Sequence, residues 1–266
     1  MAEPAAPPGE PVPVPAAGPG RLASPGDPII ANTVLPAVRR STPLDTADGL
    51  ILEGELALPV DRVPVATMVC LHPLPTHGGS MDSHLFRKAA WRLPALAGIA
   101  VLRFNSRGTR GSQGRFDGGE AERYDVAAAL DLVEAGVDGV PLPEPWLVGW
   151  SFGTELVLRY GYQDATVAGG ILISPPLKRA GAADLAGWQA TGKPLVALVP
   201  EYDDYLRPAA ARARFAAAAP AAQVVEVEGA RHLLVGARHT DRVLNEIAAR
   251  LAPGSAPLPT TWEPDS

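Results

Sequence analysis

Cysteine is almost absent from this 266-residue sequence, in which Cys70 is the only one. A single thiol excludes disulfide bonds within the chain. No window holds eighteen consecutive apolar residues, which argues against a membrane-spanning helix. The first thirty residues lack a positively charged start and an unbroken apolar segment, so they do not match a secretory signal peptide. We therefore expect a cytoplasmic protein with no membrane partner.

Positive charge is also in deficit, because 23 Lys and Arg face 29 Asp and Glu and the net charge is −6. Such a chain does not attract nucleic acid broadly, so no nucleic-acid partner is expected. The length and the 47% apolar content suit one domain, predicted at 29–252. The Pro- and Ala-rich segment 1–28 is predicted to be a disordered tail, and 253–266 a flexible one. A proline-rich tail also fits a docking ligand.

Between the tails, apolar runs alternate with helical patterns. Strands are predicted at 50–58, 65–71, 99–104, 146–150, 170–174, 195–199 and 223–227. Helices are predicted at 85–96, 121–135, 153–162, 209–218 and 240–251. Pro94 should end or kink the first of these helices. The alternation indicates an α/β fold with a mostly parallel sheet covered on both faces, and sites in such sheets lie at the carboxyl ends of the strands.

The most informative motif is Gly149-Trp-Ser151-Phe-Gly153, which ends an apolar run and precedes a helical pattern. This is the pattern of a nucleophile elbow, a sharp strand-to-helix turn that exposes the serine hydroxyl. A Cβ at either glycine would collide with the neighbouring strand or helix. The same residues also fit an ordinary turn with a surface serine, so the functional interpretation depends on finding the serine's partners elsewhere in the chain.

A serine nucleophile needs a histidine to take its proton. In this architecture an acid and then a histidine follow the serine along the chain, which leaves His232 and His239 of the five histidines. His232 comes five residues after the predicted strand that ends at Val227, where a loop at the carboxyl edge would deliver it. His239 lies near a helix start and fits a surface or capping role. We therefore favour His232.

The acid should follow the predicted strand 195–199, where three carboxylates compete. Its role is to orient the imidazole, so it should be tucked into the loop. Asp204 is favoured because Tyr-Leu-Arg-Pro follows it, a turn that leads into a helix. Asp203 and Glu201 remain the alternatives.

The oxyanion of a tetrahedral intermediate needs preorganised hydrogen-bond donors. One is the backbone amide after the nucleophile, that of Phe152. The second should come from the loop after strand 65–71, where Pro73 and Pro75 have no amide hydrogen and Leu74 is the obvious donor. His72 fits a structural residue that hydrogen-bonds this loop better than it fits a catalytic one.

Three segments carry a resemblance to a known family. They are Cys-Leu-His-Pro-Leu-Pro-Thr-His-Gly-Gly-Ser-Met-Asp (70–82), Leu-Arg-Phe-Asn-Ser-Arg-Gly-Thr-Arg-Gly-Ser-Gln-Gly (102–114) and Gly-Trp-Ser-Phe-Gly (149–153). Over about 45–252 the chain resembles the α/β-hydrolase superfamily, and within it the small bacterial serine-hydrolase branch with a His-Pro-x-Pro-x-x-Gly-Gly loop. That branch usually has histidine at position 74, where this chain has leucine. The resemblance implies an eight-stranded, mostly parallel sheet and hydrolysis through an acyl-enzyme without a metal. It implies Ser151, Asp204 and His232 as the triad, and Leu74 and Phe152 as oxyanion amides.

The interval of about twenty residues between strands 170–174 and 195–199 has room for one short helix near 184–189. We therefore predict a minimal cap or none and an open cleft. Trp150, Phe152, Leu177 and Trp188 are candidates for an apolar substrate pocket, with core packing as the alternative for each. Arg107, Arg110 and Arg115 follow strand 99–104, where they either attract an anionic substrate or form salt links that fix a glycine-rich loop.

The spacing of His72, His77 and His84 fits no standard metal-ligand pattern, so no metal is expected, and no cofactor either. The leading hypothesis is a serine hydrolase that cleaves an ester, thioester or amide of a small-molecule acyl substrate. The alternatives are an acyltransferase that uses the same triad and a non-catalytic scaffold that docks through its proline-rich tail. The sequence leaves the oligomeric state open.

Overall fold

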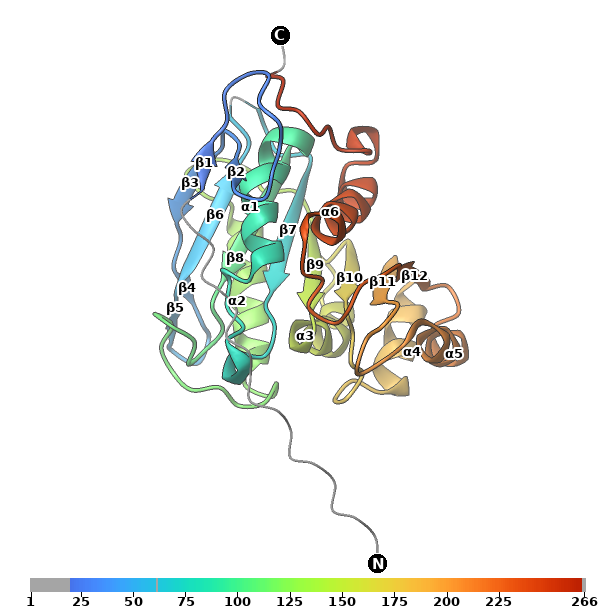
Figure 1. Cartoon of the computed structure of the whole chain (residues 1–266). Helices are drawn as coiled ribbons and strands as arrows, with labels where there is room; N and C mark the ends of the chain where they lie inside the picture. The colour runs from blue at the N-terminus through green and yellow to red at the C-terminus, as the bar shows by residue number, and fades with distance from the viewer. Residues whose placement is uncertain (1–19, 61, 265–266) are drawn as a thin grey trace, which may run out of the picture.

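The computed structural model describes residues 20–60 and 62–264, and an eight-stranded sheet runs through its centre (Figure 1). The strand order is β12-β11-β10-β9-β7-β8-β6-β3. The strands of this sheet are β3 (Val38–Ser41), β6 (Gly54–Leu58), β7 (Ala66–Leu71), β8 (Ile99–Phe104), β9 (Pro145–Trp150), β10 (Gly169–Ile173), β11 (Leu195–Pro200) and β12 (Gln223–Val227). The pairs formed by β7 to β12 are all parallel, whereas β6 and β3 add antiparallel strands at one edge. This confirms the predicted mostly parallel, eight-stranded α/β sheet.

Helices cover both faces of the sheet, as the continuous apolar strands require. The helices are α1 (His84–Ala97), α2 (Glu122–Ala135), α3 (Phe152–Tyr160), α4 (Ala182–Thr191), α5 (Pro208–Ala218) and α6 (Ala237–Leu251). One apolar core lies between the sheet and the pair α1 and α6, and a second lies between the opposite face and α2 to α5. One short helix, α4, lies between β10 and β11, in agreement with the predicted minimal cap.

Pro94 does not end α1. The helix continues to Ala97, and the next residue, Gly98, has a left-handed φ of 65°. A proline inside a helix leaves the carbonyl four residues earlier without its usual donor. That carbonyl belongs to Ala90, and the guanidinium of Arg39 donates to it over 3.1 Å. A side chain distant in sequence therefore replaces the missing backbone bond, which sequence spacing could not reveal.

Parts of both predicted tails make regular backbone hydrogen bonds. β1 (Arg21–Leu22) pairs with β2 (Thr33–Val34), although 20–28 fell inside the predicted disordered tail. The amide of Trp262 donates to the carbonyl of Asp27 over 2.8 Å, and the C-terminal segment returns along this N-terminal stretch (Figure 1). The two segments thus provide each other with backbone hydrogen bonds, a non-local pairing that composition does not signal. The rest of the predicted N-terminal tail, 1–19, lies outside the described residues.

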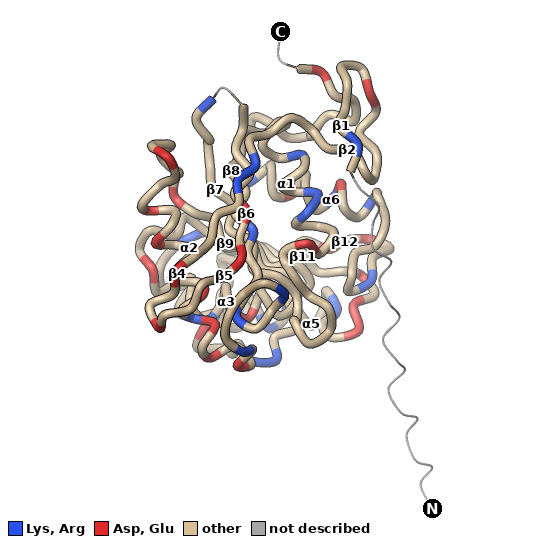
Figure 2. The backbone as a smooth tube through the Cα atoms, turned by 90° about the vertical axis from the view of Figure 1, so that its left-hand side faces the viewer, with Lys and Arg blue, Asp and Glu red and all other residues tan. Residues whose placement is uncertain are grey.

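A further two-stranded ribbon, β4 (Leu44–Asp45) with β5 (Ile51–Leu52), flanks the main sheet. Lys and Arg positions are interspersed with Asp and Glu positions along the backbone (Figure 2). Among residues 20–60 and 62–264, no helix combines the length and apolar character needed to cross a membrane.

Candidate active site

Ser151 occupies a strained turn between β9 and α3, with φ 52° and ψ −113°. This positive φ is rare for a residue with a side chain and is typical of the nucleophile elbow. A Cβ on Gly149 would lie 2.4 Å from the carbonyl oxygen of Gly153, and a Cβ on Gly153 would lie 1.8 Å from that of Leu71. Both glycines are therefore required by close backbone packing, which fixes the serine at the carboxyl edge of the sheet.

Three side chains from separate loops form a continuous hydrogen-bonded chain. Ser151 Oγ lies 2.8 Å from Nε2 of His232, and Nδ1 of the same imidazole lies 2.8 Å from Oδ2 of Asp203. With Nδ1–H donating to the carboxylate, Nε2 is free to accept the serine proton. His239, the other candidate, instead has Nδ1 2.9 Å from the carbonyl of Val235.

The expectation for the acid was wrong: Asp203, not Asp204, contacts the histidine. The Asp203 side chain is 1% exposed, and its Oδ1 accepts hydrogen bonds from the amides of Tyr205 and Leu206 over 2.8 and 3.2 Å. These bonds fold the loop back on the carboxylate and aim its other oxygen at the imidazole. Asp204 is exposed as a result. Glu201, the third candidate, accepts from the amide of Gly229.

The two predicted oxyanion amides lie in segments that touch. Phe152 begins α3, and amides in the first turn of a helix have no acceptor within it. Leu74 lies in the loop after β7, whose last carbonyl, that of Leu71, packs against Gly153. Within the described ranges, the Leu74 amide donates no hydrogen bond. Their role as oxyanion donors stays a prediction.

His72 holds the loop that carries Leu74, in the structural role predicted for it. Its Nδ1 lies 2.7 Å from the carbonyl of Pro73, and its Nε2 accepts from the amide of Ser106 over 3.0 Å. Burial lowers the pKa of His72 to about 4, partly offset by the bond to Pro73. The ring is therefore neutral at pH 7 and joins the loops that follow β7 and β8.

Of the four candidates for the apolar substrate pocket, Trp150 and Trp188 are core residues instead. Trp150 is 2% exposed and packs edge-on against His84, and Trp188 is 1% exposed and donates to the carbonyl of Leu158. Trp150 is the last residue of β9 and Trp188 is a buried residue of α4, and both side chains lie in packed layers of the core. Leu177 is half-buried, with φ 47°, in the loop after β10. It remains a candidate substrate contact.

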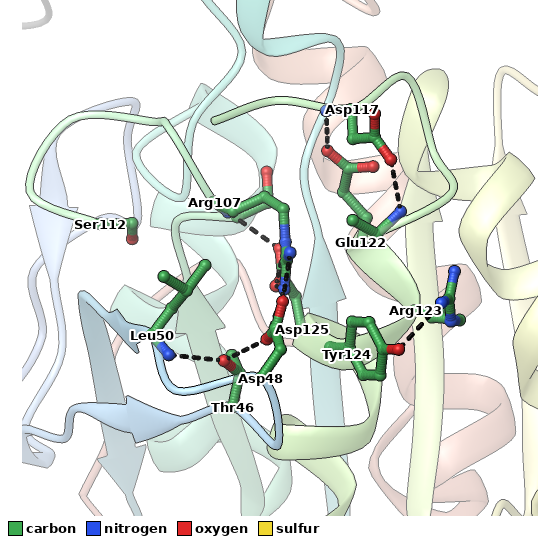
Figure 3. Close-up of polar contacts among 12 residues, drawn as sticks. Thr46, Asp48, Leu50, Arg107, Ser112, Asp117, Glu122, Arg123, Tyr124 and Asp125 are labelled. Atoms are coloured by element: carbon green, nitrogen blue, oxygen red, sulfur yellow. Dashed lines mark hydrogen bonds and ion pairs between the residues drawn. The ribbon is translucent and has the colours of Figure 1, made fainter. Parts of the chain in front are cut away.

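The three arginines after β8 divide between the two predicted roles. Figure 3 shows Arg107 between two carboxylates, and its guanidinium lies 2.8 Å from both Asp125 and Asp48. Burial raises the pKa of Asp125 to about 6, although hydrogen bonds from Arg107 oppose this shift. At Asp48 the hydrogen bonds from Arg107 dominate and lower the pKa to about 2. Arg107 is thus a structural salt link. Arg110 and Arg115 are exposed and make no ion pair with any described carboxylate.

A cleft of about 340 Å³ lies between the loops at 75–79 and 108–116. Arg110 and Phe116 are among the residues that line it. The ring of Phe116 packs edge-on against that of Phe152, with centroids 5.2 Å apart. The ring of Phe116 thus lies between the cleft and Phe152, the residue that follows Ser151.

Sequence reasoning missed Tyr205 and Glu155. The ring of Tyr205 lies 4.5 Å from that of His232, although Tyr205 itself is 51% exposed. Glu155 is fully buried, and its carboxylate accepts hydrogen bonds from the consecutive amides at 178–180. The spacing of Glu155, one helical turn after Ser151, is a signal that could have identified it.

The histidines at 72, 77 and 84 do not converge. His84 Nε2 lies 2.9 Å from the carbonyl of Leu233, and His77 Nδ1 lies 3.0 Å from the hydroxyl of Thr76. In the described part of the chain, no three His, Cys, Asp or Glu side chains gather to hold a metal ion.

Comparisons with known proteins agree with this architecture. A family model described as the alpha/beta hydrolase fold matches residues 67–219. A lidless α/β serine hydrolase from Xanthomonas campestris is 28% identical, with a TM-score of 0.64 over 86% of this chain and 99% of that one. An α/β serine hydrolase homologue from Coxiella burnetii is 26% identical, with a TM-score of 0.65 over 81% and 96%. An uncharacterised protein of Rickettsia prowazekii is 32% identical over 127 residues, which span 47% of this chain and about half, 51%, of the relative.

Proposed function

Because the chain belongs to the α/β hydrolase fold family, we propose that it is a serine hydrolase that cleaves an ester, thioester or amide through an acyl-enzyme. The observation that carries the proposal is the hydrogen-bonded chain from Ser151 through His232 to Asp203, at 2.8 Å for each contact. The elbow backbone holds the first of these residues in a conformation that an ordinary turn does not need.

In the first half-reaction, Ser151 Oγ attacks the substrate carbonyl carbon while its proton passes to His232 Nε2. The tetrahedral adduct then breaks its bond to the leaving group, which takes that proton and departs. In the second half-reaction, water gives a proton to the same nitrogen and attacks the acyl carbon. The acid is released, and Ser151 recovers its proton. Asp203 stabilises the imidazolium in both halves.

Each adduct carries a negative oxygen, which the Leu74 and Phe152 amides are proposed to bind. Leu74 needs only its backbone for this role, so leucine in place of the histidine usual in the resembling branch leaves the donor intact. The prolines on either side of Leu74 restrict the backbone of the loop, and the His72 contacts fix it further. Such preorganisation is worth about 3 kcal/mol per donor in serine hydrolysis.

The test is covalent labelling with a fluorophosphonate probe, which reacts with activated serines. We expect one adduct on the native protein, on Ser151, and none on Ser151→Ala. Ser255→Ala, beyond the C-terminal end of α6, is the matched control and should label as the native chain does. An unlabelled native protein, or labelling that persists in Ser151→Ala, would contradict the proposal. Product analysis with added alcohols would distinguish hydrolysis from acyl transfer.

A further inference from the structure

Two cationic side chains lie on rings that belong to the candidate site. Lys178 Nζ lies 4.1 Å from the centre of the Tyr205 ring, and that ring packs 4.5 Å from His232. The guanidinium carbon of Arg179 lies 5.3 Å from the centre of the Phe152 ring. Lys178 is therefore one aromatic ring away from His232, and Arg179 lies on the ring of Phe152 itself.

The backbone that carries these cations is fixed to the elbow helix. Glu155, in the first turn of α3, accepts from the amides of Lys178 and Arg179 over 2.8 and 3.0 Å, and from that of Ala180. Its carboxylate is fully buried and makes no ion pair with a cation in the described ranges. The loop after β10 thus keeps its position relative to Ser151, and the two side chains project from a rigid base.

Neither cation is neutralised by a carboxylate in the part of the chain that the structure describes. Lys178 and Arg179 make no ion pair with a carboxylate in the described ranges, although nearby Arg159 pairs with Glu120 over 2.7 Å. Arg110, on the wall of the cleft, is likewise without such a pair. A chain with a net charge of −6 has many carboxylates, yet these three cations pair with none of those in 20–60 and 62–264.

We infer that the substrate carries an anionic group, a carboxylate or a phosphate, close to the bond that is cleaved. This inference rests on the proposed hydrolase function and names its substrate class. Lys178 lies on the His232 side, where the leaving group is protonated, and Arg179 and Arg110 lie on the side of Phe152 and the cleft. Aromatic rings hold a cation without cancelling its charge, so the charge stays available to a ligand.

The test compares esters that differ in charge. On the leaving-group side, 4-acetoxybenzoate and 4-acetoxyphenyl phosphate are compared with the neutral methyl 4-acetoxybenzoate. On the acyl side, the mono-4-nitrophenyl ester of adipic acid is compared with 4-nitrophenyl hexanoate. The carboxylate and phosphate arms distinguish the two anions, and the two sides locate the group. A charge contact near a protein surface is worth about five- to tenfold in kcat/KM and weakens with salt.

The readout is the ratio of kcat/KM for the anionic ester to that for its neutral partner. We expect Lys178→Met or Arg179→Met to lower this ratio about five- to tenfold in at least one pair, and 0.5 M NaCl to lower it in the native enzyme. Lys193→Met removes the same charge at the opposite edge of the sheet, before β11, and should leave the ratio unchanged.

Equal losses on both members of every pair, or ratios that do not respond to either substitution, would overturn the inference. The proposed function would survive that result, because the neutral esters would still be hydrolysed and Ser151 still labelled. Failure of the hydrolase proposal has a separate signature, namely no turnover of any ester and no fluorophosphonate adduct.

Discussion

Replacing Asp203 with asparagine should disable catalysis by forcing the wrong protonation state on His232. The two carboxylate oxygens of Asp203 have different partners. Oδ1 accepts from the amides of Tyr205 and Leu206, and Oδ2 accepts from His232 Nδ1. Asparagine has only one oxygen, and its NH₂ group is a donor that must face one of these two sets.

Two backbone amides donate to one oxygen of Asp203, whereas one imidazole N–H donates to the other. The single oxygen of asparagine is therefore expected to face the two amides, and its NH₂ group to face the imidazole. Nδ1 must then be the unprotonated nitrogen, and Nε2 carries the hydrogen and cannot accept the Ser151 proton. Restoring the productive tautomer means turning the amide over, so that its NH₂ group faces the N–H groups of Tyr205 and Leu206. At about 2 kcal/mol for each unsatisfied contact this costs about 4 kcal/mol, or roughly a thousandfold in rate. Loss of the charge that stabilises the imidazolium adds to it.

The assay is kcat/KM on a neutral ester for Asp203→Asn and Asp204→Asn, with circular dichroism and a urea midpoint for each variant. Asp204→Asn is the matched control, because that side chain is exposed and should keep activity within about twofold. If Asp203→Asn kept more than a tenth of native activity, or if Asp204→Asn lost a hundredfold, the assignment of the acid would be refuted.

Three predictions concern stability, each measured by urea unfolding. Unfolded His72 takes up a proton near pH 6.5, whereas the buried ring stays neutral down to about pH 4. Its contribution to the free energy of unfolding therefore falls by up to about 3 kcal/mol as the pH drops from 6.5 to 4. The difference in unfolding free energy between the native protein and His72→Gln should show this slope, and a difference that does not change with pH would contradict it. Gly153→Ala should destabilise by about 3 kcal/mol or prevent folding, because its Cβ would lie 1.8 Å from a backbone oxygen, whereas Gly254→Ala, with open space around it, should cost little. Arg107→Met should cost about 3–5 kcal/mol by leaving Asp125 unpaired, and adding Asp125→Asn should recover part of the loss; an additive double variant would argue against the pair.

The fold was predictable because its strands are buried on both faces. Continuous apolar runs such as 65–71 and 195–199 have few other places in a single domain, and the helical patterns between them leave only a parallel arrangement. The termini were not predictable in the same way. Asp27 and Trp262 are brought together by a backbone pairing across almost the whole chain, and proline-rich composition masks it.

The site residues were likewise predictable only in part. Ser151 and His232 could be located because a strand end and its loop determine where they lie. The choice between Asp203 and Asp204 depends on which side chain turns back to its own loop amides, a difference of one residue that strand spacing does not resolve. Trp150 and Trp188 were misplaced because an aromatic side chain near a site suits a pocket and a core equally well in sequence.

One structural unit, β9 with α3, links the chemistry to the inferred selectivity. Its turn holds the proposed nucleophile, its first amide is the proposed oxyanion donor, and Glu155 one turn later fixes the loop that carries the two cations. Because these functions share one helix, Glu155→Gln should disturb more than stability. The amide oxygen can still accept, but its NH₂ group would face a backbone donor, so the loop should shift and the selectivity for anionic esters should fall with it. A loop that loosened without changing that selectivity would show that the cations act only as surface charges.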